Sequence, residues 1–314
     1  MTVERRPVGQ PVERVRGEHP TGDDWRADAL ASSRHSRLID ELVLPTDDFD
    51  RGRAIEVCSA IARNVLRDFA PALILLPAEL RLRAQVLAAY TATLFDFSLQ
   101  TGVEGERLAA LNRWEFDLER AFEGSPVGQP VFVLLADENR RHAWDREAFD
   151  RLTAAARERI VATRPATSED ADRRASGLAI GLLRALAGRQ LDDAARWAGA
   201  VIRVRHLTTA EEDVRRKRPQ LPSDRLPLEW LEDEEARRRE LAAAIAAEAT
   251  ELRRELESQG SVIRGLPREL RRAARYVDGA AASLLARSQR ASTSALRLGP
   301  LPRVGHLLRA WLSR

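Results

Sequence analysis

The feature that most constrains this fold is a helical hydrophobic period that runs almost unbroken from residue 55 to the end of the chain. Ala, Leu, Arg and Glu, which are strong helix formers, dominate this region. In Ile55–Asp68, for example, Cys58, Ile61 and Val65 fall on one helical stripe. Alternating runs of β-branched residues are few, and the best strand candidate, Pro130–Leu135, is short. The pattern predicts an all-α fold.

Glycine and proline divide the periodic region into successive helices. Repeats of fixed period are not evident. We therefore expect one all-α domain over residues 51–314. The predicted helices are Ile55–Asp68, Ala78–Leu99, Glu106–Phe122, Pro130–Ala143, Asp145–Ile160, Ser168–Leu186, Leu191–Val214, Leu228–Gln259, Pro267–Arg290 and a short helix after Gly299–Pro302.

Residues 1–50 differ in composition from the rest of the chain. They hold four prolines and many charges, and they show no sustained apolar period. Such a segment buries too little apolar surface to offset the entropy of ordering it. We expect a disordered or loosely ordered tail, in which Arg26–Val43 is the one candidate helix.

The overall composition excludes several classes of protein. The 314 residues carry 51 Lys and Arg against 48 Asp and Glu, and 44% of them are hydrophobic, which is unlike a fully disordered chain. Cys58 is the one cysteine, so an intramolecular disulfide is excluded. Apolar runs fall short of the roughly 20 residues of a membrane span, and the N-terminus lacks the apolar stretch of a signal peptide. We expect a cytoplasmic protein.

Positive charge gathers at the C-terminal end. Residues 264–314 hold 11 arginines against Glu269 and Asp278. The last segment places Leu301, Leu308 and Trp311 near one helical face, which is typical of a helix lying on an anionic membrane surface and equally of an ordinary packed last helix. We expect no nucleic-acid binding, because the arginines are interleaved with core-type Leu and Ala and no recognition motif is present.

Six short segments, in order along the chain, form a pattern. Each alone is weak. They are Phe69–Ala72 with Leu75–Pro77, Arg83–Tyr90, the tryptophan-containing Leu111–Gly124, the group of Pro130–Val131, Leu135–Asp137 and Arg140–Arg141, then Glu211–Pro222, and Leu266–Arg271.

Together these segments resemble the squalene/phytoene synthase family over about residues 55–314. The resemblance implies an isoprenoid-synthase-type helical bundle around a central apolar cavity, where two prenyl diphosphates are joined head to head through a cyclopropyl diphosphate. It implies Mg²⁺ held by two Asp-rich motifs, with NADPH where a squalene-type reduction follows. Mg²⁺ suits this role because it prefers oxygen ligands and neutralises a departing diphosphate. Carboxylates four residues apart share a helical face and can hold it together.

The first Asp-rich motif of the family should follow Tyr90, a predicted substrate contact. The sequence there contains one acid, Asp96, and the residue four positions later is Gln100. The resemblance assigns Asp96 a catalytic role and makes Asp96 and Gln100 candidate metal ligands. Gln is a neutral and weaker oxygen donor for Mg²⁺ than a carboxylate.

The second motif of the family should place Asn, Asp and Asp at intervals of four residues. Counted back from Leu221–Pro222, these positions hold Arg205, Thr209 and Asp213. The alternative register, counted from Gly199, restores no acid either. We predict Asp213 as a catalytic residue and metal ligand, and Arg205 as a substrate contact.

A basic run, Arg215, Arg216 and Arg218, follows the second motif. The resemblance implies contact with a diphosphate, whereas the alternative is a solvated helix end. Two functions stay open. The chain is either a head-to-head prenyltransferase, with arginines helping to bind the diphosphate, or a catalytically inactive family member that binds an isoprenoid or acts as an assembly or interaction protein.

The remaining candidates favour structural roles. Cys58 lies in an apolar stripe and is predicted to be a core residue. Gly177 and Gly181 predict close helix packing rather than a ligand loop. The five histidines show no metal-ligand spacing, and neither a P-loop nor a dinucleotide-binding glycine motif is present.

Overall fold

The computed structural model describes residues 51–99, 103–162, 164–215, 219–226, 234–288 and 297–312. Within these ranges the regular structure is helical and contains no strand, which confirms the all-α prediction. The tail predicted for residues 1–50, with its candidate helix, lies outside the described residues and stays a prediction.

The helices follow the predicted order. They are α2 (Arg51–Leu66), η1 (Arg67–Leu75), α3 (Ala78–Leu99), α4 (Glu104–Phe122), α5 (Pro130–Arg141), α6 (Arg146–Val161), α7 (Ser168–Ala187), η2 (Arg189–Ala194), α8 (Ala195–Arg215), α9 (Glu234–Ser258), α10 (Val262–Gly265), α11 (Arg268–Ser288) and α12 (Pro300–Leu312).

Two of the boundaries that differ from the prediction have a clear cause in the backbone. The first helix ends at Leu66, because Arg67 adopts a positive φ of 50° and the chain continues as the 3₁₀ helix η1 around Pro71. The helix predicted from Leu191 begins instead at Ala195, after the 3₁₀ segment η2 that follows the positive-φ Gly188. In both places a backbone conformation incompatible with an α-helix sets the boundary.

The short strand candidate is helical. Pro130 occupies the first turn of α5, where its fixed φ suits a helix start and its missing N–H leaves no bond unmade. Val131, Phe132 and Leu134 are fully buried on this helix. Burial of an apolar helical face therefore overrides the β-propensity of the sequence.

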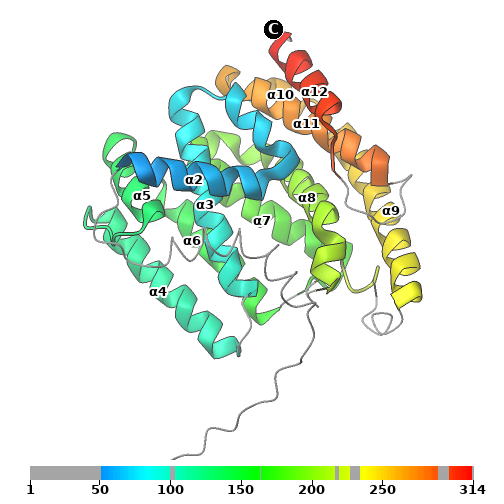
Figure 1. The fold of residues 1–314 in the computed structure, drawn as a ribbon, viewed down its shortest axis with the longest axis horizontal. Helices are drawn as coiled ribbons and strands as arrows, with labels where there is room; N and C mark the ends of the chain where they lie inside the picture. The colour runs from blue at the N-terminus through cyan, green and yellow to red at the C-terminus, as the bar shows by residue number, and fades with distance from the viewer. Residues whose placement is uncertain are drawn as a thin grey trace, which may run out of the picture.

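The apolar residues form two adjoining clusters. Figure 1 shows α4, α5 and α6 on one side of the bundle and α9, α11 and α12 on the other. One cluster contains residues from α2 through α6 and includes the rings of Tyr90, Trp114 and Phe149. The ring centroids of Tyr90 and Phe149 lie 5.1 Å apart. The other joins η1, α8, α9, α11 and α12. Cys58 is buried in the first cluster with its thiol free, which confirms the core assignment, and burial raises the pKa of this thiol to about 12.

Small residues set the close approach of the central helices. A Cβ at Gly181 would lie 2.9 Å from the Leu152 side chain on α6, which confirms the packing role predicted for it. Gly177 has open space around it, so the prediction fails at that position. A Cβ at Gly199, on α8, would lie 2.8–3.0 Å from Ser176 on α7.

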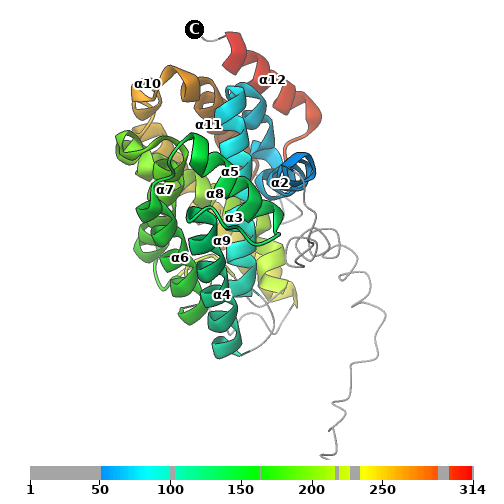
Figure 2. The same ribbon diagram turned by 90° about the vertical axis from the view of Figure 1, so that its left-hand side faces the viewer.

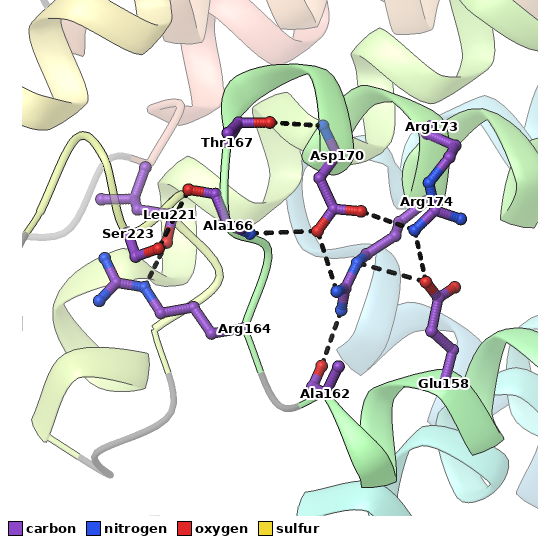
Figure 3. Close-up of polar contacts among 10 residues, drawn as sticks. All are labelled: Glu158, Ala162, Arg164, Ala166, Thr167, Asp170, Arg173, Arg174, Leu221 and Ser223. Atoms are coloured by element: carbon purple, nitrogen blue, oxygen red, sulfur yellow. Dashed lines mark hydrogen bonds and ion pairs between the residues drawn. The ribbon is translucent and has the colours of Figure 1, made fainter.

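The connection from α6 to α7 fastens the loop that follows α8 (Figure 3). Arg164 donates hydrogen bonds to the carbonyl oxygens of Leu221 and Pro222, at 2.8 and 2.9 Å, and Ser223 donates to Ala166 O at 3.0 Å. Beside this contact the Thr167 hydroxyl caps α7. The loop after the second predicted motif is thereby held against the bundle.

Candidate functional site

The second predicted motif lies on one face of α8. Arg205, Thr209 and Asp213 are four residues apart and share that face, and all three are partly buried. The Thr209 hydroxyl donates to a carboxylate oxygen of Asp213 at 2.9 Å. The three positions of the register counted from Leu221–Pro222 thus form one polar, partly buried face of α8.

Arg205 reaches the end of α2. Its Nε donates to the carbonyl oxygen of Val65 at 2.8 Å, satisfying a carbonyl in the last turn of α2 that lacks a partner within the helix. Arg67 lies nearby and pairs with Glu212 at 3.2 Å. Burial is the main cause that lowers the pKa of Arg205 to about 10, and repulsion from Arg67 adds to it. Attraction to Asp213 and Glu212 acts in the opposite direction.

Arg159, on α6, is added to the candidate site by the structure, since no sequence pattern distinguishes it from the many other arginines of the helices. Its guanidinium carbon lies 5.5 Å from the centroid of the Phe95 ring, which precedes Asp96 on α3. The same guanidinium acts electrostatically on His206 and Asp213 of α8. One cation is therefore close to both predicted motifs.

The surroundings disfavour charge on α8. Burial, followed by Arg159, Arg205 and Arg203, lowers the pKa of His206 well below its ordinary value. Burial also raises the pKa of Asp213, although the Thr209 hydrogen bond and the nearby arginines oppose the rise. Neutral His206 is the form that this position favours.

The other predicted site residues are placed differently. Tyr90 is fully buried in the aromatic cluster, where its hydroxyl lies 3.4 Å from that of Thr153. Asp96 is partly buried near the end of α3 and, six residues on, lies about 240° around the helix from Tyr90. The structure therefore brings Asp213 and His206 of α8 into the electrostatic range of Arg159, which also contacts Phe95 beside Asp96, and it leaves Tyr90 inside the core.

Three predicted positions lie outside what the structure describes. They are Gln100, Arg216 and Arg218. Arg215 is the last residue of α8, and only its backbone is described. The roles assigned to these four residues stay predictions.

A separate surface groove of about 610 Å³ opens between α4 and α6. Among its lining residues, Arg157 pairs with Glu115 at 2.6 Å. The groove contains none of the predicted site residues, and its charges are already paired, so it is not the candidate site.

The family model of squalene/phytoene synthases matches residues 62–304, which include α3, α6 and α8. The chain belongs to the squalene/phytoene synthase family. The match covers most of the range over which the sequence segments resembled the family, and it confirms that resemblance. A search of curated proteins found no match.

Solved structures support the same fold. A crystal structure of a dehydrosqualene synthase in complex with a ligand is similar, with a TM-score of 0.66 and 16% identity, covering 83% of this chain and 96% of that one. The squalene synthase HpnC from Alicyclobacillus acidocaldarius gives a TM-score of 0.59 and 21% identity, covering 81% and 97%. At these identities the likeness establishes the isoprenoid-synthase-type all-α fold.

Members of this family generally depend on Mg²⁺ held by Asp-rich motifs. The described residues of this chain do not fit that ion. They contain no group of three or more Asp, Glu, His or Cys residues placed to hold a metal. At the second motif Arg205 stands at the first, Asn, position and Thr209 at the following Asp position, and Asp213 accepts a hydrogen bond from Thr209.

Proposed function

We propose that this protein is a squalene/phytoene synthase-like prenyltransferase that condenses two prenyl diphosphates head to head, in isoprenoid, carotenoid or squalene biosynthesis. The observation that carries the proposal is the approach of α3 and α8 to one cation, Arg159, within a chain of this family. Asp96 and Asp213 are the proposed catalytic residues.

The partly accessible face of α8 is the proposed ligand-binding surface. Arg205, His206 and Asp213 keep part of their surface accessible, and burial is the largest influence on the pKa of each. We propose that these side chains line the space in which the diphosphate binds. Such a space, with apolar walls deeper in the bundle, would shield an allylic cation from water.

Arginines would carry the headgroup chemistry in this site. Departure of diphosphate from the allylic carbon develops negative charge on the leaving oxygens, and a fixed cation stabilises that charge. Arg159 and Arg205 are the described candidates, and Arg215, Arg216 and Arg218 are proposed to extend the contact at the end of α8. Tyr90 is proposed to act on the substrate indirectly, by packing the wall behind α3.

A specific observation favours a second function. Arg205 stands at a metal-facing position and its Nε is engaged by the carbonyl of Val65, as expected of a structural residue. A catalytically inactive family member would keep the fold and the ligand-binding surface while losing metal-assisted ionisation. It would bind an isoprenoid or serve as an assembly or interaction protein.

In either function the substrate or product is apolar, and such a molecule would exchange between the protein and a lipid bilayer. Among the described residues, no helix is both long and apolar enough to cross a bilayer. We therefore include peripheral contact with the inner face of a membrane in the proposed function.

Product analysis tests the proposal. The purified chain would be incubated with radiolabelled farnesyl or geranylgeranyl diphosphate, with Mg²⁺ or with EDTA, and with or without NADPH. A C30 or C40 hydrocarbon, or a cyclopropyl diphosphate, is expected. Dependence on Mg²⁺ or on NADPH would identify the cofactor used.

Matched variants connect activity to the site. Asp96→Ala and Asp213→Ala should abolish product formation, whereas Asp193→Ala, which removes an exposed acid elsewhere, should not. Unchanged turnover in both site variants would refute the residue assignment. Failure of the folded wild-type protein to convert either substrate would favour the inactive, isoprenoid-binding function.

A further inference from the structure

The last helix of the described chain turns an apolar face to solvent. Among the described residues, nine large hydrophobic side chains are exposed, and five of them lie on α12. Because they recur at intervals of three and four residues, they form one continuous stripe. The α12 stripe consists of Leu301 (83% exposed), Val304 (52%), Leu308 (55%), Trp311 (61%) and Leu312 (68%).

The opposite face of α12 is firmly attached to the bundle. Ala310 is buried, and the His306 ring lies 2.9 Å from the Ser283 hydroxyl of α11. Gly279 permits this contact, because a Cβ there would lie 2.7 Å from the His306 ring. The helix is therefore docked by specific contacts that leave the α12 stripe exposed, and the stripe is not the surface by which α12 packs on α11. Figure 2 shows α12 at the periphery of the bundle.

Charge beside the stripe identifies the partner. The sequence contains no acidic residue after Asp278, whereas Arg309, on α12, and Arg297, three residues before the helix begins, are exposed. An apolar stripe flanked by arginines and ending in tryptophan suits the interface of an anionic bilayer. A second copy of the chain fits less well, because an isologous contact would bring two identical arginine-flanked faces together.

We propose that α12 lies in the plane of an anionic membrane surface, with the α12 stripe inserted among the acyl chains and Arg309 against lipid phosphates. This inference rests on the proposed function in one respect, which is that membrane contact would allow the protein to exchange apolar isoprenoids with the bilayer. A helix of 13 residues is about 20 Å long, which suits an interfacial orientation.

The contacts also join the docking helix to the candidate site. Arg303, on α12, pairs with the buried Asp68, which also accepts a hydrogen bond from the backbone N–H of Leu298 at 3.2 Å. The neighbouring Arg67 pairs with Glu212 on α8. Two adjacent residues of η1 thus connect the proposed membrane face with the site, which places the site at a fixed distance from the bilayer.

Vesicle sedimentation tests the proposal with the full chain and no prenyl diphosphate. Vesicles of phosphatidylcholine alone would be compared with an equal mixture of phosphatidylcholine and phosphatidylglycerol. Binding to the mixed vesicles is expected, and the double variant Leu308→Ser with Trp311→Ser should weaken it by about tenfold or more. Phe116→Ser removes an exposed aromatic residue of α4 and is the matched control that should bind normally.

The charge contribution has its own variant. Arg309→Gln should weaken binding to the mixed vesicles by about fivefold and leave binding to neutral vesicles unchanged. Absence of vesicle binding by the folded wild-type chain would overturn the proposal, as would equal binding by the double variant. A dimer in analytical ultracentrifugation that the double variant dissociates would assign the stripe to a second copy instead. Because the assay needs no substrate, its outcome is independent of the product analysis.

Discussion

Two arginines of α8, Arg203 and Arg205, lie on opposite sides of the helix, since two residues correspond to about 200°. Arg203 is 7% exposed and meets a surplus of carboxylates. It donates to Glu248 at 3.0 Å from Nε and at 2.5 Å from Nη2, and it lies 3.4 Å from Glu255 and 3.5 Å from Asp172. Arg205 is partly accessible, makes one hydrogen bond to a backbone carbonyl and lies near a second cation.

The difference separates scaffold from site. On the Arg203 side three acids surround one guanidinium, and burial together with Asp172 raises the pKa of Glu255. That side joins α7, α8 and α9 and has its geometry fixed by multiple ion pairs. On the Arg205 side, cations gather on a partly accessible face of α8, where the proposed function places the diphosphate.

Removing the buried cation should have the largest effect. Arg203→Met keeps most of the side-chain volume but leaves Glu248, 2% exposed, without its partner. The free energy of unfolding in urea at neutral pH should fall by about 3–5 kcal/mol. Arg253→Met, which breaks an exposed pair with Glu257, is the control and should lower it by less than about 1 kcal/mol. Similar values for the two variants would mean that the buried cluster is not a scaffold.

The corresponding change on the other side of α8 should act on ligand binding. Arg205→Met removes a donor of charge-assisted hydrogen bonds, which contribute about 1.5–3 kcal/mol each, so the affinity for geranylgeranyl diphosphate should fall by roughly tenfold to a hundredfold. Calorimetric titration measures this affinity. Geranylgeraniol, which lacks the diphosphate, should bind the variant and the wild type equally. Equal loss for both ligands would indicate a collapsed ligand-binding surface rather than a lost headgroup contact.

A smaller effect concerns pH and His206. The pKa of His206 is lower in the folded protein than in the unfolded chain. As the pH falls below about 6.5, the unfolded chain therefore binds a proton that the folded protein does not, and the free energy of unfolding decreases. This one group can lower the free energy of unfolding by at most about 1.4 kcal/mol per pH unit below that point. His206→Asn should remove this part of the pH dependence in urea denaturation, whereas replacement of the exposed His142 by Asn should not. An unchanged slope in His206→Asn would contradict the cationic surroundings assigned to α8.

Much of the fold could be predicted because its determinants are local. Helical periodicity and the positions of Gly and Pro define most helices within a few residues, and Pro130 even marks a helix start within a strand-like sequence. Two helix boundaries were predicted wrongly, at Arg67 and before Ala195. They depend on backbone torsion angles, which cannot be inferred from the spacing of hydrophobic residues. The family and two of the candidate acids, Asp96 and Asp213, were also accessible from sequence segments.

The sequence by itself determined the helical class, the helix order and the register that puts Arg205, Thr209 and Asp213 on one face, because these follow from spacing along the chain. The tertiary structure decided which charges meet. Arg203 finds Glu248 across 45 residues, and Arg159 of α6 approaches both α3 and α8. Arg203 and Arg205 are the same residue type on opposite sides of α8. The packing of other helices buries Arg203 among carboxylates and leaves Arg205 partly accessible. The sequence alone could not separate them, because burial and ion pairing depend on neighbours that are distant in sequence.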